Sequence, residues 1–211
     1  YGGLLTRLVA ANQELDFEMS QGVQPNNFDT DDDARSAGLG FYLEYDTRDM
    51  PMNSYSGRHL KVNALFNDEN LSSNRTYQNY DVAYRSYHTL TDSLVLAWEV
   101  QGCSRKGTGP LWDACTIKLR GFSATDFLGS TTLSGQAEAR WQFSKRWGLV
   151  GFAGAGDVSD SFSGLRDQNT IPSYGAGLRF MVLPPKRINI RVDFAWSRDS
   201  EAIHLSVGEA F

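Results

Sequence analysis

Apolar and polar residues alternate along residues 187–197, near the carboxyl end of the chain. A period of two places successive side chains on opposite faces and predicts a β-strand. Residues 201–211 repeat the pattern. In these two segments one face carries Ile188, Ile190, Val192, Phe194, Trp196, Ile203, Leu205, Val207 and Phe211, and the other carries Arg187, Asn189, Arg191, Asp193, Ser197, His204, Ser206 and Gly208.

Similar segments recur along the chain and predict an all-β protein with one antiparallel sheet that is apolar on one face and polar on the other. Such a sheet forms a soluble barrel or sandwich if the apolar face points inward, and a membrane barrel if it points outward. The eleven expected strands are residues 3–10, 13–21, 36–46, 57–67, 75–87, 92–102, 130–143, 146–157, 173–182, 187–197 and 201–211.

The lengths of the connections favour the membrane barrel. The long connections all fall on one side of the predicted sheet, whereas those on the other side are tight or, for residues 47–56, intermediate. Short turns at one end and long loops at the other are typical of outer-membrane barrels, whose long loops face the cell exterior. The long connections are residues 21–35, 67–74, 103–129 and 159–172, and the tight ones include 89–91, 144–145 and 184–186.

Length, composition and charge exclude further classes of protein. The chain has 211 residues, enough for one β-domain spanning residues 1–211, and its formal net charge is −5. No apolar run approaches the roughly 18–20 residues that a membrane helix needs. The acidic balance and the lack of a basic stripe argue against a nucleic-acid partner. The chain begins at Tyr1 without a methionine, so we expect a mature product or a fragment.

Two cysteines lie close together in the longest connection. Cys103 and Cys115 form a disulfide if the protein folds in an oxidising compartment, and otherwise remain two free thiols. Two cysteines without nearby histidines are too few for a metal site, and His59, His88 and His204 are scattered. We therefore expect no metal, no cofactor and no enzymatic activity.

Four local motifs, in this order, resemble the bacterial surface antigen superfamily, the outer-membrane insertase group that contains BamA and TamA. The resemblance covers roughly residues 36–211, and as in that family five expected strands follow the Arg-Gly-Phe motif. The motifs are Phe41-Tyr-Leu-Glu-Tyr-Asp-Thr-Arg-Asp49 with Ser56-Gly57, then Leu119-Arg-Gly-Phe122, Gly135-Gln-Ala-Glu-Ala-Arg140, and Ile203-His-Leu-Ser-Val-Gly-Glu-Ala-Phe211.

The resemblance implies a transmembrane antiparallel β-barrel and a role for each motif. The loop that carries Arg120, Gly121 and Phe122 would fold back into the barrel lumen, where the guanidinium fork of Arg120 would pair with a carboxylate. Glu138, on the polar face of the next strand, is the expected partner. A surface arginine in a loose loop is the alternative. Asp46, Arg48 and Asp49 belong to the strand-turn motif, in which Asp46 and Arg48 would close the turn or pair across the lumen if the alternation continues past Tyr45. Leu205, Val207 and Phe211 would form the carboxyl-terminal targeting signal.

The chain also departs from the family pattern. Where the family strand after Glu138 carries a lumenal aspartate, this chain has Gly154. The family barrel has sixteen strands, whereas about 10–12 are expected here, so either the first strands are missing or the barrel is shortened. The periplasmic POTRA domains of the family are absent from residues 1–211 as well.

The family resemblance implies a function that does not involve a catalysed reaction. We expect a protein of the bacterial outer membrane that inserts other outer-membrane proteins or translocates polypeptides. Its expected partners are outer-membrane lipid and lipopolysaccharide, unfolded polypeptide clients and periplasmic accessory proteins. Two alternatives stay open: the barrel anchors and exports a fused patatin-like lipase domain, or it is a passive pore.

Overall fold

A computed structural model describes residues 1–12, 28–29, 33–122, 127–166, 170–198 and 200–211. Ten strands form one antiparallel sheet in which neighbours in the sheet are neighbours in the chain. They are β1 (Gly2–Asn12), β3 (Asp33–Asp46), β4 (Gly57–Asn67), β5 (Tyr77–Thr91), β6 (Leu94–Gly107), β10 (Thr131–Gln142), β11 (Trp147–Ser159), β12 (Ile171–Leu183), β13 (Ile188–Ser197) and β14 (Glu201–Val207).

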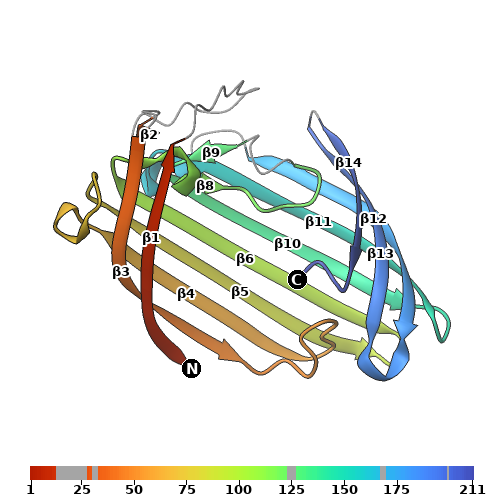
Figure 1. The fold of residues 1–211 in the computed structure, drawn as a ribbon. Coiled ribbons are helices and arrows are strands. Elements are labelled where there is room, and N and C mark those ends of the chain that lie inside the picture. Colours follow the sequence, from red (N-terminus) through yellow and green to blue (C-terminus); the bar gives the residue numbers. More distant parts are fainter. Residues whose placement is uncertain (13–27, 30–32, 123–126, 167–169, 199) are drawn as a thin grey trace.

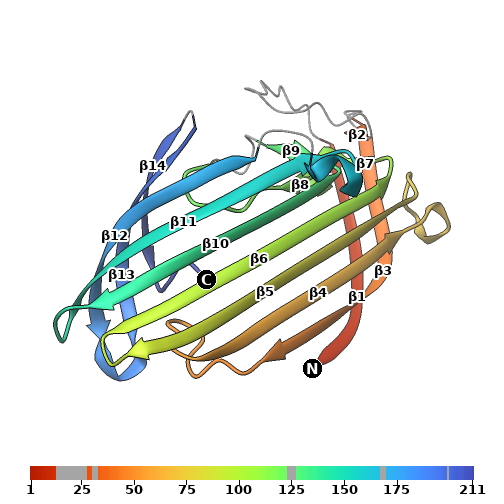
Figure 2. The same cartoon turned by 180° about the vertical axis from the view of Figure 1, so that it is seen from behind.

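The sheet curls into an incomplete barrel (Figures 1 and 2). In the described part of the chain, β1 pairs only with β3 and β14 only with β13, so the two end strands of the sheet keep one free edge each. The predicted antiparallel barrel fold is confirmed, although the sheet is not closed. The expected strand at residues 13–21 lies outside the described residues.

The apolar face of the sheet is exposed and the polar face is buried, which is the reverse of the arrangement in a soluble protein. Along β12, Tyr174 and Leu178 are exposed, whereas Ser173 and Arg179 are buried. A surface of this kind is expected where lipid covers the outside and a polar lumen lies within. The same holds for other strands, whose exposed apolar side chains include Leu39, Phe41, Leu43, Leu133, Trp141, Leu149, Ile190, Phe194 and Trp196.

The long connections gather at one end of the curled sheet, which also holds the tight turn between β13 and β14, and the other tight turns and the ten-residue connection between β3 and β4 lie at the opposite end (Figure 1). The longest connection joins β6 to β10. It begins after Gly107, because β6 extends beyond the expected end of that strand, which leaves Cys103 in a strand. This connection contains β7 (Gly109–Pro110), η2 (Leu111–Asp113), β8 (Cys115–Thr116) and β9 (Leu128–Gly129); β7 pairs with β2 (Phe28–Asp29), and β8 with β9.

Helical structure is limited in the described residues to four short 3₁₀ segments, none of them long and apolar enough to cross a membrane. They are η1 (Glu69–Leu71), η2, η3 (Phe162–Arg166) and η4 (Pro184–Lys186).

Candidate functional site

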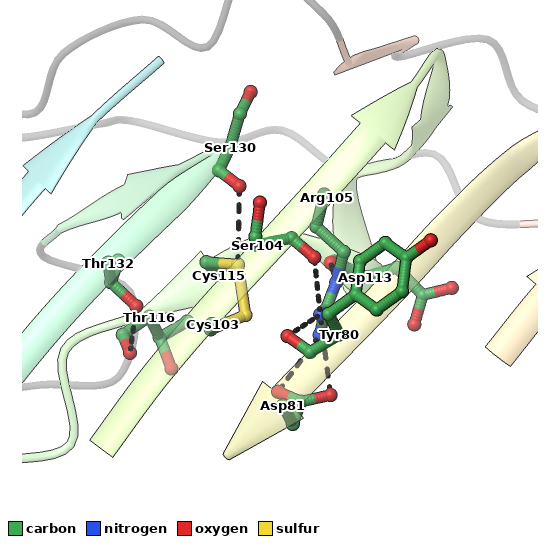
Figure 3. The surroundings of a disulfide bond; sticks show 10 residues. All are labelled: Tyr80, Asp81, Cys103, Ser104, Arg105, Asp113, Cys115, Thr116, Ser130 and Thr132. Carbon is green, nitrogen blue, oxygen red and sulfur yellow. Dashed lines mark hydrogen bonds and ion pairs between the residues drawn. A yellow bond between two sulfur atoms is a disulfide. The ribbon is translucent and has the colours of Figure 1, made fainter. Parts of the chain in front are cut away.

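The connection between β6 and β10, hereafter the long loop, is fixed to the inner face of the sheet at its start. Cys103 in β6 and Cys115 in β8 form a disulfide (Figure 3). Beside it, Arg105 donates to the backbone carbonyl of Asp113 and forms an ion pair with Asp81 on β5, with 3.3 Å between Nη1 and Oδ2. The covalent bond and the ion pair together hold residues 103–115 against the wall.

Further along, the long loop is docked by a small apolar cluster. Ile117, Leu119 and Phe122 pack against Val158 of β11 and Ile171 of β12, and all five are buried. Burying apolar side chains is the dominant favourable term when a loop docks on a scaffold. The Arg-Gly-Phe motif is thereby carried over the polar inner face rather than into solvent.

Gly121 allows the loop to pass close to the last two strands. Its φ of +93° lies in the left-handed region, which favours glycine. Its amide donates to His204 Nε2 at 3.4 Å, and its carbonyl accepts from Ser200 Oγ at 2.6 Å. The neighbouring carbonyl of Arg120 accepts from Ser173 Oγ. These contacts tie the motif to β12, to β14 and to the turn that precedes β14.

Arg120 points to buried carboxylates on two strands. Its Nη2 lies 2.6 Å from Glu138 Oε2, and its Nη1 lies 3.2 Å from Asp193 Oδ2. Its Nε donates to Gln136 Oε1 at 2.8 Å, and the guanidinium carbon lies 3.5 Å from the ring centroid of Phe152. A guanidinium held by charge-assisted bonds and stacked on an aromatic ring has one preferred orientation. The structure therefore brings Arg120 and Glu138 together and adds Asp193.

A second set of charged side chains extends this contact across the inner face. Arg140 donates to the other oxygen of Glu138, from Nε to Oε1 at 2.6 Å. Arg179 donates from Nη1 to Asp193 Oδ1, and its Nε lies 2.8 Å from Glu209 Oε2. Glu209 Oε2 is also 4.0 Å from Arg140 Nε. Because all these side chains are almost fully buried, each charge depends on its partners.

Glu209 and Phe211 belong to a carboxyl-terminal tail that leaves the sheet after Val207. Gly208 has a φ of +90° and breaks the alternation, so the tail turns into the concavity of the sheet (Figure 1). The Phe211 carbonyl accepts from Arg140 Nη2 at 3.0 Å. The predicted common face of Leu205, Val207 and Phe211 is therefore wrong for Phe211: the first two are 74% and 59% exposed, whereas Phe211 lies over the interior arginines.

Asp46 and Arg48 contact one another at the end of β3. Two hydrogen bonds join them, from Arg48 Nη2 to Asp46 Oδ2 at 2.7 Å and from Nε to Oδ1 at 3.0 Å. The Arg48 amide also donates to Oδ1 at 3.0 Å. The pair therefore caps the β3–β4 connection.

Asp49 has a different set of partners. Its Oδ1 accepts the amides of Met50 and Tyr55 at 3.0 Å, and its Oδ2 pairs with Arg187 between β12 and β13. Burial would raise the pKa of Asp49, but hydrogen bonds from Arg187 and from the amides of Tyr55 and Ser56 outweigh burial and lower the pKa. The β3–β4 connection is thereby bridged to the opposite side of the curled sheet.

In the described residues, one group of side chains has the donor types for a metal ion. Ligand atoms of Glu44, Asp46 and His59 lie within 4.8 Å of one another. Both oxygens of Asp46 already accept from Arg48, and Lys61 Nζ is 3.6 Å from Glu44 Oε1. Arg48 and Lys61 therefore neutralise the charges of the two carboxylates, and we assign no metal to this group.

Sequence reasoning missed Asp193, Arg179 and Glu209. Asp193 was placed on the polar face of its strand, and it is the only acidic residue among the polar positions of residues 187–197. Gly154 in place of the family's aspartate pointed to Glu138 as the partner of Arg120 and gave no indication of Asp193. Glu209 gave no signal, because strict alternation in residues 201–211 would place it on the apolar face.

Gly177 sets the space available to this charged cluster. A methyl group there would lie 1.9 Å from Asp193 Oδ1 and 2.6 Å from Arg179 Nη1. We expect Gly177→Ala to displace the Asp193 carboxylate and lower the free energy of unfolding by about 1–3 kcal/mol, measured by urea unfolding in lipid vesicles. Gly151→Ala is the matched control, because nothing lies within 4 Å of a methyl group there. Equal stability of the two variants would contradict the close packing.

Comparison with known proteins places the chain in a family. The profile of the Omp85 superfamily domain matches residues 6–211. Comparison with curated protein sequences gives no match. Among solved structures, the crystal structure of BamA from Haemophilus ducreyi lacking POTRA domains 1–3 is similar, with a TM-score of 0.63 and 12% sequence identity. The match covers 83% of this chain and 42% of that chain, so the chain spans less than half of that BamA structure.

The structural likeness concerns the fold, and the match to the superfamily profile covers nearly all of the chain. The profile match agrees with the family that the four sequence motifs indicate. The chain belongs to the Omp85 superfamily, a family of outer-membrane β-barrel proteins.

Proposed function

We propose that this chain is the barrel part of an outer-membrane protein that assembles other outer-membrane proteins or translocates polypeptides, without an enzymatic step. Superfamily membership supports the general activity. The observation that carries the proposal is the placement of Arg120: the long loop is docked inside the curled sheet and held by Glu138 and Asp193.

The free edge of the sheet suggests how an unfolded client would be assembled. In the described residues β14 pairs with β13 alone and offers its other edge. The unpaired backbone donors and acceptors of an edge strand favour the addition of another strand. An unfolded client would pair with the β14 edge and fold strand by strand into the lipid. Glu138, Asp193 and Arg120 would keep the long loop docked on the inner face of the sheet while this edge pairs with a client.

The exposed apolar band and the aromatic side chains near the strand ends suit a membrane setting. Trp141, Trp147 and Tyr174 are all exposed on the outer face. Aromatic girdles at the interfaces are common in outer-membrane barrels. We propose outer-membrane lipid and lipopolysaccharide as the surroundings, unfolded outer-membrane or exported polypeptides as clients, and periplasmic proteins as accessory partners.

The test is a folding assay with the full-length protein in liposomes. The folding rate of an unrelated unfolded outer-membrane barrel is followed, and empty liposomes and liposomes with an inert barrel are the controls. We expect faster folding of the client only with this protein present. If the correctly folded protein gives no acceleration, the proposal fails in favour of an anchor for a fused enzyme domain or a passive pore.

A further inference from the structure

Six buried charged side chains form a closed ring in which positive and negative charges alternate. Each member forms an ion pair with the next, and the pair between Asp193 and Arg120 closes the ring. In order, the members are Arg120, Glu138, Arg140, Glu209, Arg179 and Asp193. The ring draws on five segments of the chain: the long loop, β10, β12, β13 and the carboxyl-terminal tail. Two of these segments, the long loop and the tail, are not part of the sheet.

The charge balance of the ring depends on the tail. Arg191 adds a fourth guanidinium, 3.0 Å from Asp193 Oδ2, so four arginines face three carboxylates. Without Glu209, the same four would have Glu138 and Asp193 as their remaining carboxylates, and Arg140 would keep its bonds to the carbonyl oxygens of Ser54 and Phe211. Removing one partner from a buried ionic cluster leaves uncompensated charge, which the remaining members must redistribute.

The excess charge would act most strongly on Arg120. Glu138 gives one oxygen to Arg120 and the other to Arg140, and Asp193 divides its oxygens in a similar way between Arg120 and Arg179. If Glu209 is lost, Arg179 loses a partner at 2.8 Å and Arg140 loses a more distant one at 4.0 Å, and both would compete more strongly for the carboxylates that hold Arg120. Arg140 and Arg179 stand on strands, whereas Arg120 stands on a loop and is the easiest member to displace.

The tail is also tied to the rest of the chain by hydrogen bonds. The Gly208 amide donates to the Asn189 carbonyl at 2.8 Å, and the Glu209 amide donates to the Met52 carbonyl at 3.1 Å. Asn189 Nδ2 donates to Glu209 Oε1 at 2.6 Å. Since the tail directly follows β14, these contacts hold the end of a strand that has one neighbour in the described sheet.

We propose that Glu209 is a positioning residue that couples the docked long loop to the edge strand β14 through the charge ring. Arg120 and Glu209 form no direct ion pair, yet loosening either one loosens the other through the ring members between them. The Phe211 ring, 6.0 Å from the guanidinium carbon of Arg120, is a second link between the loop and the tail. The consequence for a client at the edge rests on the proposed function, whereas the coupling is a property of the folded chain alone.

Amide hydrogen exchange of the full-length protein in lipid nanodiscs, without a client, tests the coupling. Glu209→Gln keeps the shape of the side chain and removes its charge. We expect exchange about tenfold faster in residues 117–122, in keeping with couplings of 0.5–3 kcal/mol between members of one network. In the reciprocal measurement, Arg120→Gln should speed exchange in residues 208–211.

Glu201→Gln is the matched control, since it removes the same charge from an exposed position on β14, and it should leave residues 117–122 unchanged. Glu209→Asp keeps the charge and should restore most of the protection. The proposal is overturned if Glu209→Gln speeds exchange in the tail alone. Should that variant not fold, the effect of Arg120→Gln on residues 208–211 decides the question by itself. Because no client is present, a negative folding assay leaves this result standing.

Discussion

Arg120→Ala is expected to lower the free energy of unfolding by about 3 kcal/mol, because it removes one partner from two buried carboxylates. Glu138→Ala should cost a similar amount, since it leaves Arg120 and Arg140 without their shared carboxylate. The double variant should lose less than the sum of the two, with a coupling of about 1–3 kcal/mol. Urea unfolding in lipid vesicles measures all three.

Arg146→Ala is the control for loss of an arginine at an exposed position outside the cluster. It should change the free energy of unfolding by less than about 0.5 kcal/mol, as surface substitutions usually do. If Arg120→Ala and Glu138→Ala prove additive, the pairing does not stabilise the protein. In the liposome assay, Arg120→Ala should also reduce the acceleration of client folding under conditions in which the variant itself remains folded.

Loss of the Cys103–Cys115 disulfide is expected to lower the free energy of unfolding by about 3 kcal/mol. The bond closes a short loop, with a sequence separation of 12, and a cross-link of this length restricts the unfolded chain by about that amount. The start of the long loop would lose its covalent tie to β6. The double variant Cys103→Ala/Cys115→Ala, studied by urea unfolding with and without a reductant, measures the effect.

The reductant provides the control for this substitution. Reduction should destabilise the wild-type protein by nearly as much as the double substitution does, and it should leave the double variant unchanged. A single substitution, Cys115→Ala, should match the double variant because either change removes the bond. Wild-type stability that does not change when both thiols are shown to be reduced would contradict a stabilising role for the disulfide.

Much of the fold could be predicted from the alternation of residue types. A period of two fixes which side chains share a face, and this property is local to each strand. The exposed Tyr174 and the buried Arg179 lie on opposite faces of β12, as the pattern indicates. The alternation failed at Gly208, because a single residue with positive φ reverses the assignment of everything that follows it.

The site could be predicted only in part for a related reason. The sequence indicated that Arg120 lies in a long loop and that Glu138 faces the polar side. Alternation gives the face of a side chain but not its height along the barrel, nor which strands lie within reach of a loop. Asp193 is 73 residues from Arg120, and their contact depends on the register of β10 to β13 and on the docking of the long loop.

The strands of the described sheet, their faces, the side on which the long loops lie and the family could all be predicted from the sequence. Those features follow from local periodicity and from short motifs. Three features are visible only in the folded chain: Phe211 turns inward, Asp193 serves as the second carboxylate, and Glu209 closes the ring of charges. These contacts join segments far apart in the chain, and their geometry is set by the sum of strand registers and the curl of the sheet.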